Sequence, residues 1–393
     1  MKLRISWIVL MLLLTACNMS VTSFPAAPGG PAAPSTEAPP TPYPDTPAPE
    51  AINTSPVESP ALVAIHFLNE LEAWGVTETQ IVRTNDGGST WYNVTPPDVT
   101  DTASIGTFIL DTTHAWVQKP DFNNFPNNGL LYRTNDGGLT WTISSTPFSG
   151  GDLSFIDVHN GWMLADLGVG AGSNAVAVFQ TKDSGMTWTQ TYTNDPNSPD
   201  AGDSLPLGGL KSDLMPLDMQ TAWVSGVTYS SGTAYLYRTD DGGHTWSLVN
   251  LEVPAGAENF ELSIDKDQMQ FISARDGFLV VRLAGDSTQT AVYVTHDGGT
   301  TWTLTPTLIP SAGESNFLSA REAVIYNGEQ FYVTRDAAQT WTSVSPNIVF
   351  GDSFVTMDFV DLATGWIVTL DPSKHRSLYR TNDGGTTWLP VMP

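Results

Sequence analysis

The chain repeats one short motif seven times. The final copy, Tyr379–Trp388, has the sequence YRTNDGGTTW, and the core shared by the copies is Thr-x-Asp-x-Gly-x-Thr-Trp. The motif aspartates are Asp86, Asp136, Asp183, Asp241, Asp297, Asp336 and Asp383, and the motif tryptophans are Trp91, Trp141, Trp188, Trp246, Trp302, Trp341 and Trp388. Consecutive aspartates are 39 to 58 residues apart. This spacing indicates seven repeats of one supersecondary unit, numbered here 1 to 7.

Each motif has the chemistry of a tight turn between two strands. Aromatic and β-branched residues lead into it, as is typical of a strand. The aspartate can accept hydrogen bonds from nearby backbone N–H groups, and the glycine allows a positive φ. Repeat 6 has Asp336-Ala337-Ala338 and so lacks both glycines. We therefore expect its turn to be altered but still present.

A second pattern lies upstream of each turn. A small residue precedes an aromatic or apolar one, and a short apolar run comes before the pair. The pairs are Ala73-Trp74, Ala115-Trp116, Gly161-Trp162, Ala222-Trp223, Gly277-Phe278, Ala323-Val324 and Gly365-Trp366. Each repeat is thus predicted to contain four short strands. Four strands in about 47 residues, repeated seven times, predict an all-β, seven-bladed β-propeller of four-stranded antiparallel blades.

The expected blades occupy residues 61–95, 102–146, 150–193, 208–251, 260–305, 314–345 and 352–392. Every repeat has its own first and fourth strand, so the ring is expected to close without exchanging a strand between its ends. Twelve of the 13 tryptophans belong to the two repeating patterns, and the other is Trp7. Each of the twelve is therefore predicted to have a structural role.

The N-terminus has a different character. Two basic residues precede an apolar run from Ile5 to Leu14, which is too short to span a membrane comfortably. Leu14-Thr15-Ala16-Cys17 resembles the lipobox of bacterial lipoproteins. The resemblance implies a signal peptide over residues 1–16, lipid attachment at Cys17 and a place in the bacterial cell envelope outside the cytoplasm. The alternative is an ordinary signal peptide.

Residues 17–60 are predicted to form the lipidated terminus and a proline-rich, disordered stalk, because such a composition buries little apolar surface. The propeller would then occupy residues 61–393. Cys17 is the single cysteine, which excludes an internal disulfide. The six histidines have no close metal-ligand spacing, so the sequence predicts no metal and no cofactor.

The formal net charge is −25. Such an acidic chain lacks the basic footprint of a nucleic-acid-binding protein. It would favour cations or basic proteins as partners. We expect a monomer that meets the membrane only through its lipid.

The repeated turn resembles the Asp-box, or BNR repeat, of sialidases, some endoglucanases, sortilin-type receptors and photosystem II stability/assembly factors. Seven such turns combined with small-aromatic second strands look most like the photosystem II assembly factor group. The resemblance covers residues 61–393. It implies that the turns join the outer two strands of each blade, far from the central channel, so it points to a fold and not to one activity.

The motif aspartates are interpreted as structural, because symmetry spreads them around the rim, where they cannot converge on one substrate. A sialidase is unlikely on this sequence, which has no Arg-x-Pro motif. Four of its nine mature arginines occupy one equivalent position before the turn: Arg83, Arg133, Arg238 and Arg380. These four are expected to pair with surface acids.

The insertions between strands are better guides to function, because loops commonly carry it. The longest are residues 119–129, 166–174, 192–209 and 251–260, and they are expected to gather on the face opposite the motif turns. Six residues there form a candidate partner face: Phe122, Phe125, Tyr192, Asp195, Asp200 and Asp203. The sequence therefore predicts a non-enzymatic platform that binds a protein, and the acidic charge favours a basic one. The alternative is a carbohydrate-active enzyme or glycan-binding protein of the Asp-box, sialidase-like type.

Substituting Cys17 tests the predicted anchor. Cys17→Ala should abolish lipid attachment and leave the folded domain intact, because the cysteine precedes that domain. Metabolic labelling with a tagged fatty acid measures this. Label retained by the variant would contradict the lipoprotein interpretation.

Overall fold

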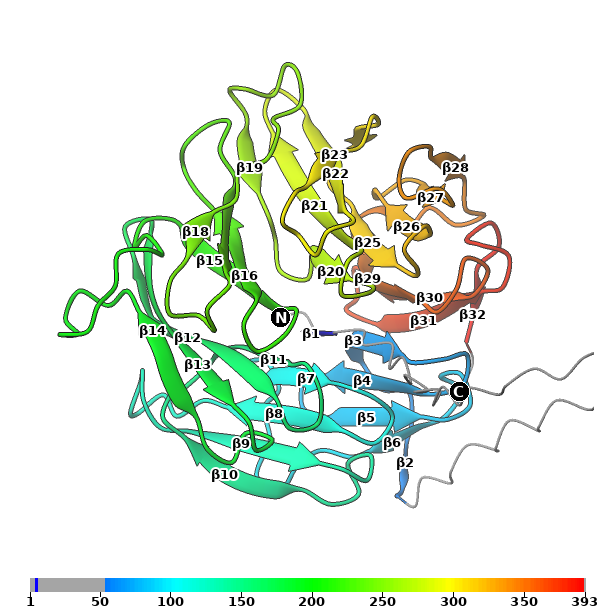
Figure 1. Ribbon diagram of the computed structural model, residues 1–393. Helices are drawn as coiled ribbons and strands as arrows, with labels where there is room; N and C mark the ends of the chain where they lie inside the picture. The colour runs from blue at the N-terminus through cyan, green and yellow to red at the C-terminus, as the bar shows by residue number, and fades with distance from the viewer. Residues whose placement is uncertain (1–3, 6–53, 392–393) are drawn as a thin grey trace, which may run out of the picture.

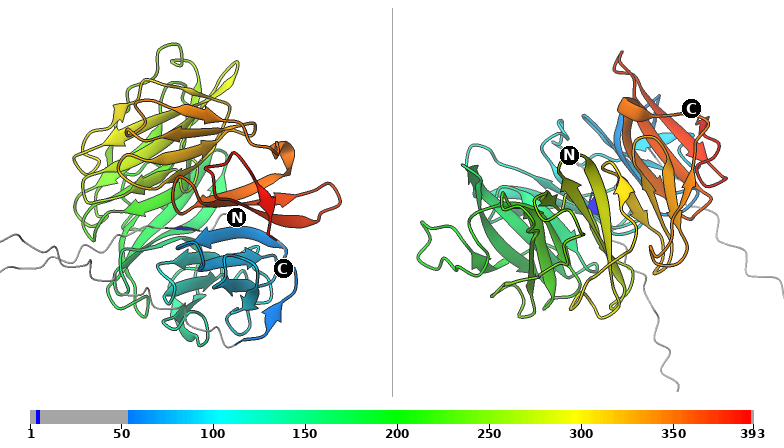
Figure 2. Two further views of the ribbon diagram at one scale, coloured as in Figure 1. Left: turned by 90° about the vertical axis from the view of Figure 1, so that its right-hand side faces the viewer. Right: turned by 90° about the horizontal axis from the view of Figure 1, so that it is seen from above.

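The computed structural model describes residues 4–5 and 54–391; Cys17 and the predicted stalk up to residue 53 lie outside the described residues. The described chain is all-β apart from one short 3-10 helix, Gly351–Ser353 (η1). Its sheets stand around a common centre (Figure 1), and the views in Figure 2 show them side by side from two further directions. This part of the chain contains no helix that could span a membrane.

Each of the first four repeats contains four consecutive antiparallel strands, and repeats 4 and 5 are joined in one ten-stranded sheet by the pairing of Val227 with Ser263. The strands of the first four repeats are β3 Leu62–Phe67, β4 Ala73–Thr77, β5 Ile81–Thr84 and β6 Trp91–Asn93; β7 Gly106–Ile109, β8 Ala115–Lys119, β9 Gly129–Thr134 and β10 Thr142–Thr146; β11 Gly151–Phe155, β12 Gly161–Gly170, β13 Ser173–Thr181 and β14 Thr189–Thr193; and β15 Leu210–Pro216, β16 Ala222–Val227, β17 Tyr235–Thr239 and β18 Ser247–Leu248.

The last three repeats follow the same plan. Their strands are β19 Glu261–Ser263, β20 Met269–Phe271, β21 Gly277–Ala284, β22 Thr288–Thr295, β23 Thr303–Leu304 and β24 Ile309–Pro310; β25 Glu314–Phe317, β26 Ala323–Tyr326, β27 Phe331–Thr334 and β28 Thr342–Val344; and β29 Phe354–Phe359, β30 Gly365–Leu370, β31 Arg376–Thr381 and β32 Leu389–Pro390. In repeat 5 the first strand is split into β19 and β20, which both pair with β21.

Two short strands are additions to this plan. Pro56–Val57 (β2) pairs with β6 at the outer edge of the first sheet, and Arg4–Ile5 (β1) pairs in parallel with β7. Both end repeats are built from consecutive strands, as expected for a ring that closes without strand exchange. The β-propeller and its four-stranded antiparallel sheets are confirmed.

Every second strand begins at the small residue of its predicted pair. Repeat 7 shows why a small residue is needed at this position. There Gly365 lies against the ring of Phe359 at the end of the first strand. A Cβ on Gly365 would lie 2.5 Å from that ring. Glycine therefore lets the phenylalanine fold back across its own hairpin.

The aromatic residue of the pair makes the contact to the next repeat. Trp116 stacks on Phe155 with ring centroids 3.8 Å apart, and Phe278 stacks on Phe317 at 4.4 Å. The second-strand tryptophans are fully buried, and several donate their indole N–H to a backbone carbonyl of the next repeat. These bonds join Trp74 to Asp111, Trp116 to Ser184 and Trp162 to Asp218.

The same contact closes the ring between repeat 7 and repeat 1. Trp366 stacks on Phe67 at 3.6 Å and donates its indole N–H to the carbonyl of Gly87 over 3.1 Å. Asp358 on β29, the first strand of repeat 7, accepts the backbone N–H of Phe67 over 2.6 Å. His66 Nδ1 lies 3.2 Å from the same carboxylate. Side chains alone thus hold the first and last sheets together.

A pair of tryptophans isolates the contribution of the indole hydrogen bond. Trp223 resembles Trp366, since it stacks on a phenylalanine and lies beneath an arginine, but its buried indole N–H has no hydrogen-bond partner. Trp366→Phe should therefore lower the free energy of unfolding by about 1–3 kcal/mol more than Trp223→Phe, because it strands a carbonyl acceptor. Urea unfolding of the two variants measures the difference. Equal losses would show that the bond to Gly87 contributes nothing.

Candidate functional site

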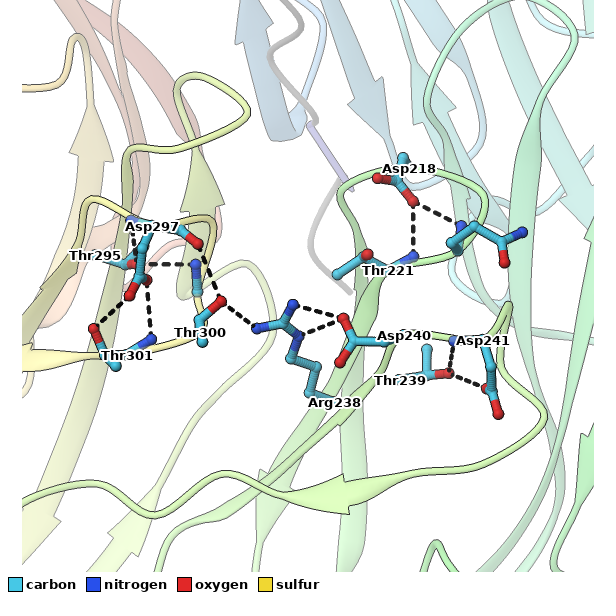
Figure 3. A network of polar contacts seen from close by, with 12 residues as sticks. Asp218, Thr221, Arg238, Thr239, Asp240, Asp241, Thr295, Asp297, Thr300 and Thr301 are labelled. Carbon is cyan, nitrogen blue, oxygen red and sulfur yellow. Dashed lines mark hydrogen bonds and ion pairs between the residues drawn. The ribbon is translucent and has the colours of Figure 1, made fainter.

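The motif turns are closed by hydrogen bonds among their own residues. In repeat 5, Asp297 Oδ1 accepts the hydroxyl of Thr295 over 2.8 Å and the backbone N–H of Thr301 over 2.9 Å. Its Oδ2 accepts the Thr301 hydroxyl over 2.7 Å, and Thr295 Oγ1 accepts the N–H of Gly299. Figure 3 shows this arrangement. The carboxylate thereby joins the end of one strand to the start of the next.

Repeat 6 keeps the same turn without its glycines. Asp336 accepts the same three hydrogen bonds from Thr334 and Thr340. Ala337 and Ala338 adopt φ values of 60° and 62°, close to those of the glycines they replace. The expected alteration of this turn is therefore wrong, because the threonine and aspartate contacts hold two alanines in the left-handed region.

These hydrogen bonds also lower the pKa of six of the turn aspartates. Burial alone would raise the pKa of Asp297, but hydrogen bonds from the N–H and hydroxyl of Thr301 and from the Thr295 hydroxyl outweigh it and lower the pKa to about 2. The pKa values of Asp136, Asp183, Asp241, Asp336 and Asp383 are lowered in the same way. A carboxylate held ionised by its own turn is poorly suited to act as a general acid.

Four of the side chains that precede the turns are arginines that reach into the next repeat. Arg238 ion-pairs with Asp240 at 2.6 Å and also donates to the hydroxyl of Thr300 in the following turn over 3.0 Å (Figure 3). Arg83 and Arg133 instead donate to the carbonyls of Gly137 and Asp183, and Arg380 pairs with Glu70. The expected pairing with acids therefore holds for Arg238 and Arg380, whereas Arg83 and Arg133 bond to backbone carbonyls.

A groove lies between repeats 6 and 7. Repeat 6 has Val333 at the arginine position and Val324 at the tryptophan position. A groove of about 650 Å³ lies there between Val333, Asp336 and the turns of repeat 7.

The opposite face carries the insertions, as predicted. The loop 120–128 joins the second and third strands of repeat 2, while 194–209 and 249–260 connect one repeat to the next. The strands β12 and β13 extend toward this face, and their hairpin bonds to the connection that follows, with Asn174 N–H donating to the Leu207 carbonyl over 3.0 Å. We call this side the loop face.

The loop 120–128 presents two phenylalanines on the loop face. Phe122 is 68% exposed and Phe125 is 46% exposed. The loop is held from within by Asp121, which accepts the side-chain N–H of Asn124 over 2.7 Å. It is also tied to the next connection, because Ser149 donates its N–H to the Pro126 carbonyl over 2.7 Å. The exposed rings therefore stand on an ordered support.

Tyr192 does not belong with them. Its side chain is 6% exposed and packs in the core between repeats 3 and 4, where its hydroxyl accepts the N–H of Leu205 over 2.8 Å. The prediction that Tyr192 belongs to an exposed partner face is therefore wrong. The loop that follows keeps Asp200 and Asp203 exposed and Asp195 half-buried, with Asp195 capping its own turn.

The sequence did not single out Tyr229, which is 64% exposed on the loop between β16 and β17. It lies against the hairpin of the previous repeat, where a Cβ on Gly172 would be 2.9 Å from its ring. A lone tyrosine in a run of small polar residues was the available signal. Together with Phe122 and Phe125, it gives the loop face three exposed aromatic rings.

Carboxylates on the innermost strands form a further set that sequence reasoning missed. Asp152 accepts the N–H of Leu214 over 2.6 Å and pairs with Lys266 at 2.8 Å. Glu314 accepts the hydroxyl of Thr356 over 2.9 Å. Asp358 at the seam acts likewise. Each acid links its first strand to that of another repeat, so these groups have structural partners. The sequence signal that could have found them is an acidic residue within a first strand.

The described residues 4–5 and 54–391 contain no cluster of three His, Cys, Asp or Glu side chains able to hold a metal ion. The chemistry available on the loop face is therefore that of aromatic rings, hydroxyls and scattered charges. These groups suit a ligand with both apolar and hydroxyl-bearing faces.

No model of a known protein family matches the chain. Its sequence is 24% identical over 247 residues to a xyloglucanase of Hypocrea jecorina, a match that covers 55% of this chain and 29% of that enzyme. It is 23% identical over 340 residues to a xyloglucanase of a Paenibacillus species, covering 81% of this chain and 28% of that enzyme. The chain thus spans less than a third of the length of these relatives.

Solved structures show the same fold. A GH74 xyloglucanase from Xanthomonas campestris superposes with a TM-score of 0.55 at 12% identity, covering 84% of this chain and 54% of that one. YCF48 bound to a D1 peptide superposes with a TM-score of 0.50 at 16% identity, covering 85% and 98%. Identities this low establish a shared propeller fold alone.

These comparisons correct the function predicted from sequence. A non-enzymatic protein-binding platform is wrong, because both sequence matches and one structural neighbour are xyloglucanases. They support the alternative, a carbohydrate-active enzyme or glycan-binding protein. The acidic charge led the sequence reasoning toward a basic protein partner, although glycan recognition makes no demand on net charge.

Acid titration tests the structural role of the turn aspartates. A lowered folded pKa stabilises the fold fully above the unfolded value of about 4, and this contribution is lost as the pH falls to about 2. Asp297→Asn should therefore lower the melting temperature at pH 6, and the gap to the unsubstituted protein should close near pH 2. Thermal unfolding from pH 6 to pH 2 measures it. A gap that is independent of pH would exclude a role for the ionised carboxylate.

Proposed function

We propose that this chain is a carbohydrate-active propeller that binds a polysaccharide of the xyloglucan type on its loop face. The observation that carries the proposal is the match to xyloglucanases, one of which extends over 81% of the chain. We infer in addition that the propeller has seven blades, that its turns are Asp-boxes, and that Cys17 anchors it by lipid outside the cytoplasm.

The loop face supports the proposal through its aromatic rings. One face of a pyranose ring presents C–H groups, which pack against an aromatic ring and remove apolar surface from water. Phe122, Phe125 and Tyr229 offer three such surfaces on different repeats. The hydrogen bonds that hold the loop 120–128 limit the entropy lost when a ligand binds.

The aspartate turns do not carry the function in this proposal. Their carboxylates are committed to threonines of the same turn, and they face away from the loops. Glycoside cleavage requires two carboxyl groups on either side of one bond, at about 5–9.5 Å separation. The relatives are more than three times as long as the segment they share with this chain, so their activity does not by itself assign cleavage to this chain.

Binding to soluble xyloglucan, measured by affinity electrophoresis of the full-length protein, tests the proposal. Replacing Phe122 and Phe125 together by Ser should weaken binding by about 1–2 kcal/mol per ring, because each ring buries part of its apolar surface under a sugar. Met186→Ser is the matched control, since Met186 is 50% exposed on the turn of repeat 3.

Release of reducing ends, followed in the same samples, separates the two forms of the proposal. New reducing ends identify a hydrolase, and binding without them identifies a glycan-binding protein. Failure to bind xyloglucan, or equal binding by the double variant, would contradict the proposed loop-face site.

A further inference from the structure

A small cavity opens on the loop face where the first and last repeats meet. It has a volume of about 300 Å³ and lies between repeats 7, 1 and 2. Val63, Val76 and Val355 supply aliphatic walls, and Thr107 adds a hydroxyl. Arg376 and Glu78 are the charged residues of the lining. This volume is at the lower end of the range for small-ligand sites, which suits a single sugar unit.

Arg376 is the unusual member of this lining. Its side chain is only 13% exposed, and its Nη1 is buried without a hydrogen-bond partner among the described residues. Its Nη2 lies 3.7 Å from Glu78 Oε1, beyond hydrogen-bond distance, and the Glu78 side chain is 75% exposed. A buried, charged donor left unpaired is costly, so an acceptor that reached it would be bound favourably.

The Arg380 side chain also has a buried nitrogen, Nε, without a hydrogen-bond partner among the described residues, but it has a structural explanation that Arg376 lacks. Its guanidinium group lies 5.0 Å from the ring centre of Trp366, and it donates to Glu70 of the adjoining repeat. Among the described residues, no aromatic ring lies beneath Arg376 in this way.

We propose that this seam cavity binds the carboxylate of an acidic sugar unit through the guanidinium group of Arg376. The inference rests on the proposed function, since it takes the ligand to be a glycan, and it extends the substrate class from neutral xyloglucan-type chains to polysaccharides that contain uronic acid. A guanidinium matches a carboxylate through two parallel N–H donors. The valine walls would cover the C–H face of the same sugar ring.

Isothermal titration of the full-length protein with trigalacturonate tests the inference. Arg376→Gln should weaken binding by about 10–100-fold, the loss expected for hydrogen bonds to a charged group. Glu78→Gln should strengthen it by about 2–5-fold, because an exposed competing carboxylate is removed. Arg275→Gln, on an exposed arginine of the motif-turn face, is the matched charge control and should change nothing.

Three results would overturn the inference: no binding of trigalacturonate, equal binding by Arg376→Gln, or binding of free glucuronate without binding of the trimer. If Arg376→Gln fails to fold, the response of Glu78→Gln decides instead, and unchanged affinity in that variant contradicts the proposal. Xyloglucan binding by the same samples separates the two proposals. Xyloglucan bound without trigalacturonate leaves the proposed function standing and rejects the acidic subsite.

Discussion

The stacking of a second-strand aromatic ring on the first strand of the next repeat is the contact on which the propeller depends. A four-stranded sheet with two apolar faces is not stable alone, and it must bury both against neighbours. Here the burial is directed by flat rings, as between Trp366 and Phe67 at 3.6 Å. The indole N–H then fixes the distance to the next turn by bonding to a backbone carbonyl. Ring closure uses this same contact, so the ends of the chain meet without sharing a strand.

The motif turn supports this arrangement from the outer side of each hairpin. Threonine, aspartate and a left-handed pair of residues exchange hydrogen bonds within a few positions of the chain. Repeat 6 shows how strongly they determine the backbone, because Ala337 and Ala338 adopt the positive φ values that glycine adopts elsewhere. Non-glycine residues in this region are strained by about 1–2 kcal/mol each. The turn of repeat 6 therefore tolerates this strain, because the hydrogen bonds of its threonines and aspartate hold the backbone in place.

Because the turns are occupied with their own structure, the proposed function is placed on the other face. The loops there differ from repeat to repeat, and they bring exposed rings, acids and one buried arginine to a surface that the strands hold rigid. This division is common in propellers and barrels, where a regular scaffold carries variable loops. It also explains why the matches to xyloglucanases establish a fold more firmly than a substrate: the regular strands and turns align, while the loops decide recognition.

The sequence by itself determined the strand order, the turns and the position at which every second strand begins. These features depend on contacts within a few residues, so a local pattern is enough to specify them. Tertiary structure alone decided that Tyr192 is buried, that acids on inner strands bond to neighbouring repeats, and that Arg376 shares a cavity with Glu78. Those contacts are made between different repeats, and the cavity of Arg376 and Glu78 forms where ring closure brings repeats 7 and 1 together. No local pattern records which side chains meet there, because their environment is created by repeats far away in sequence.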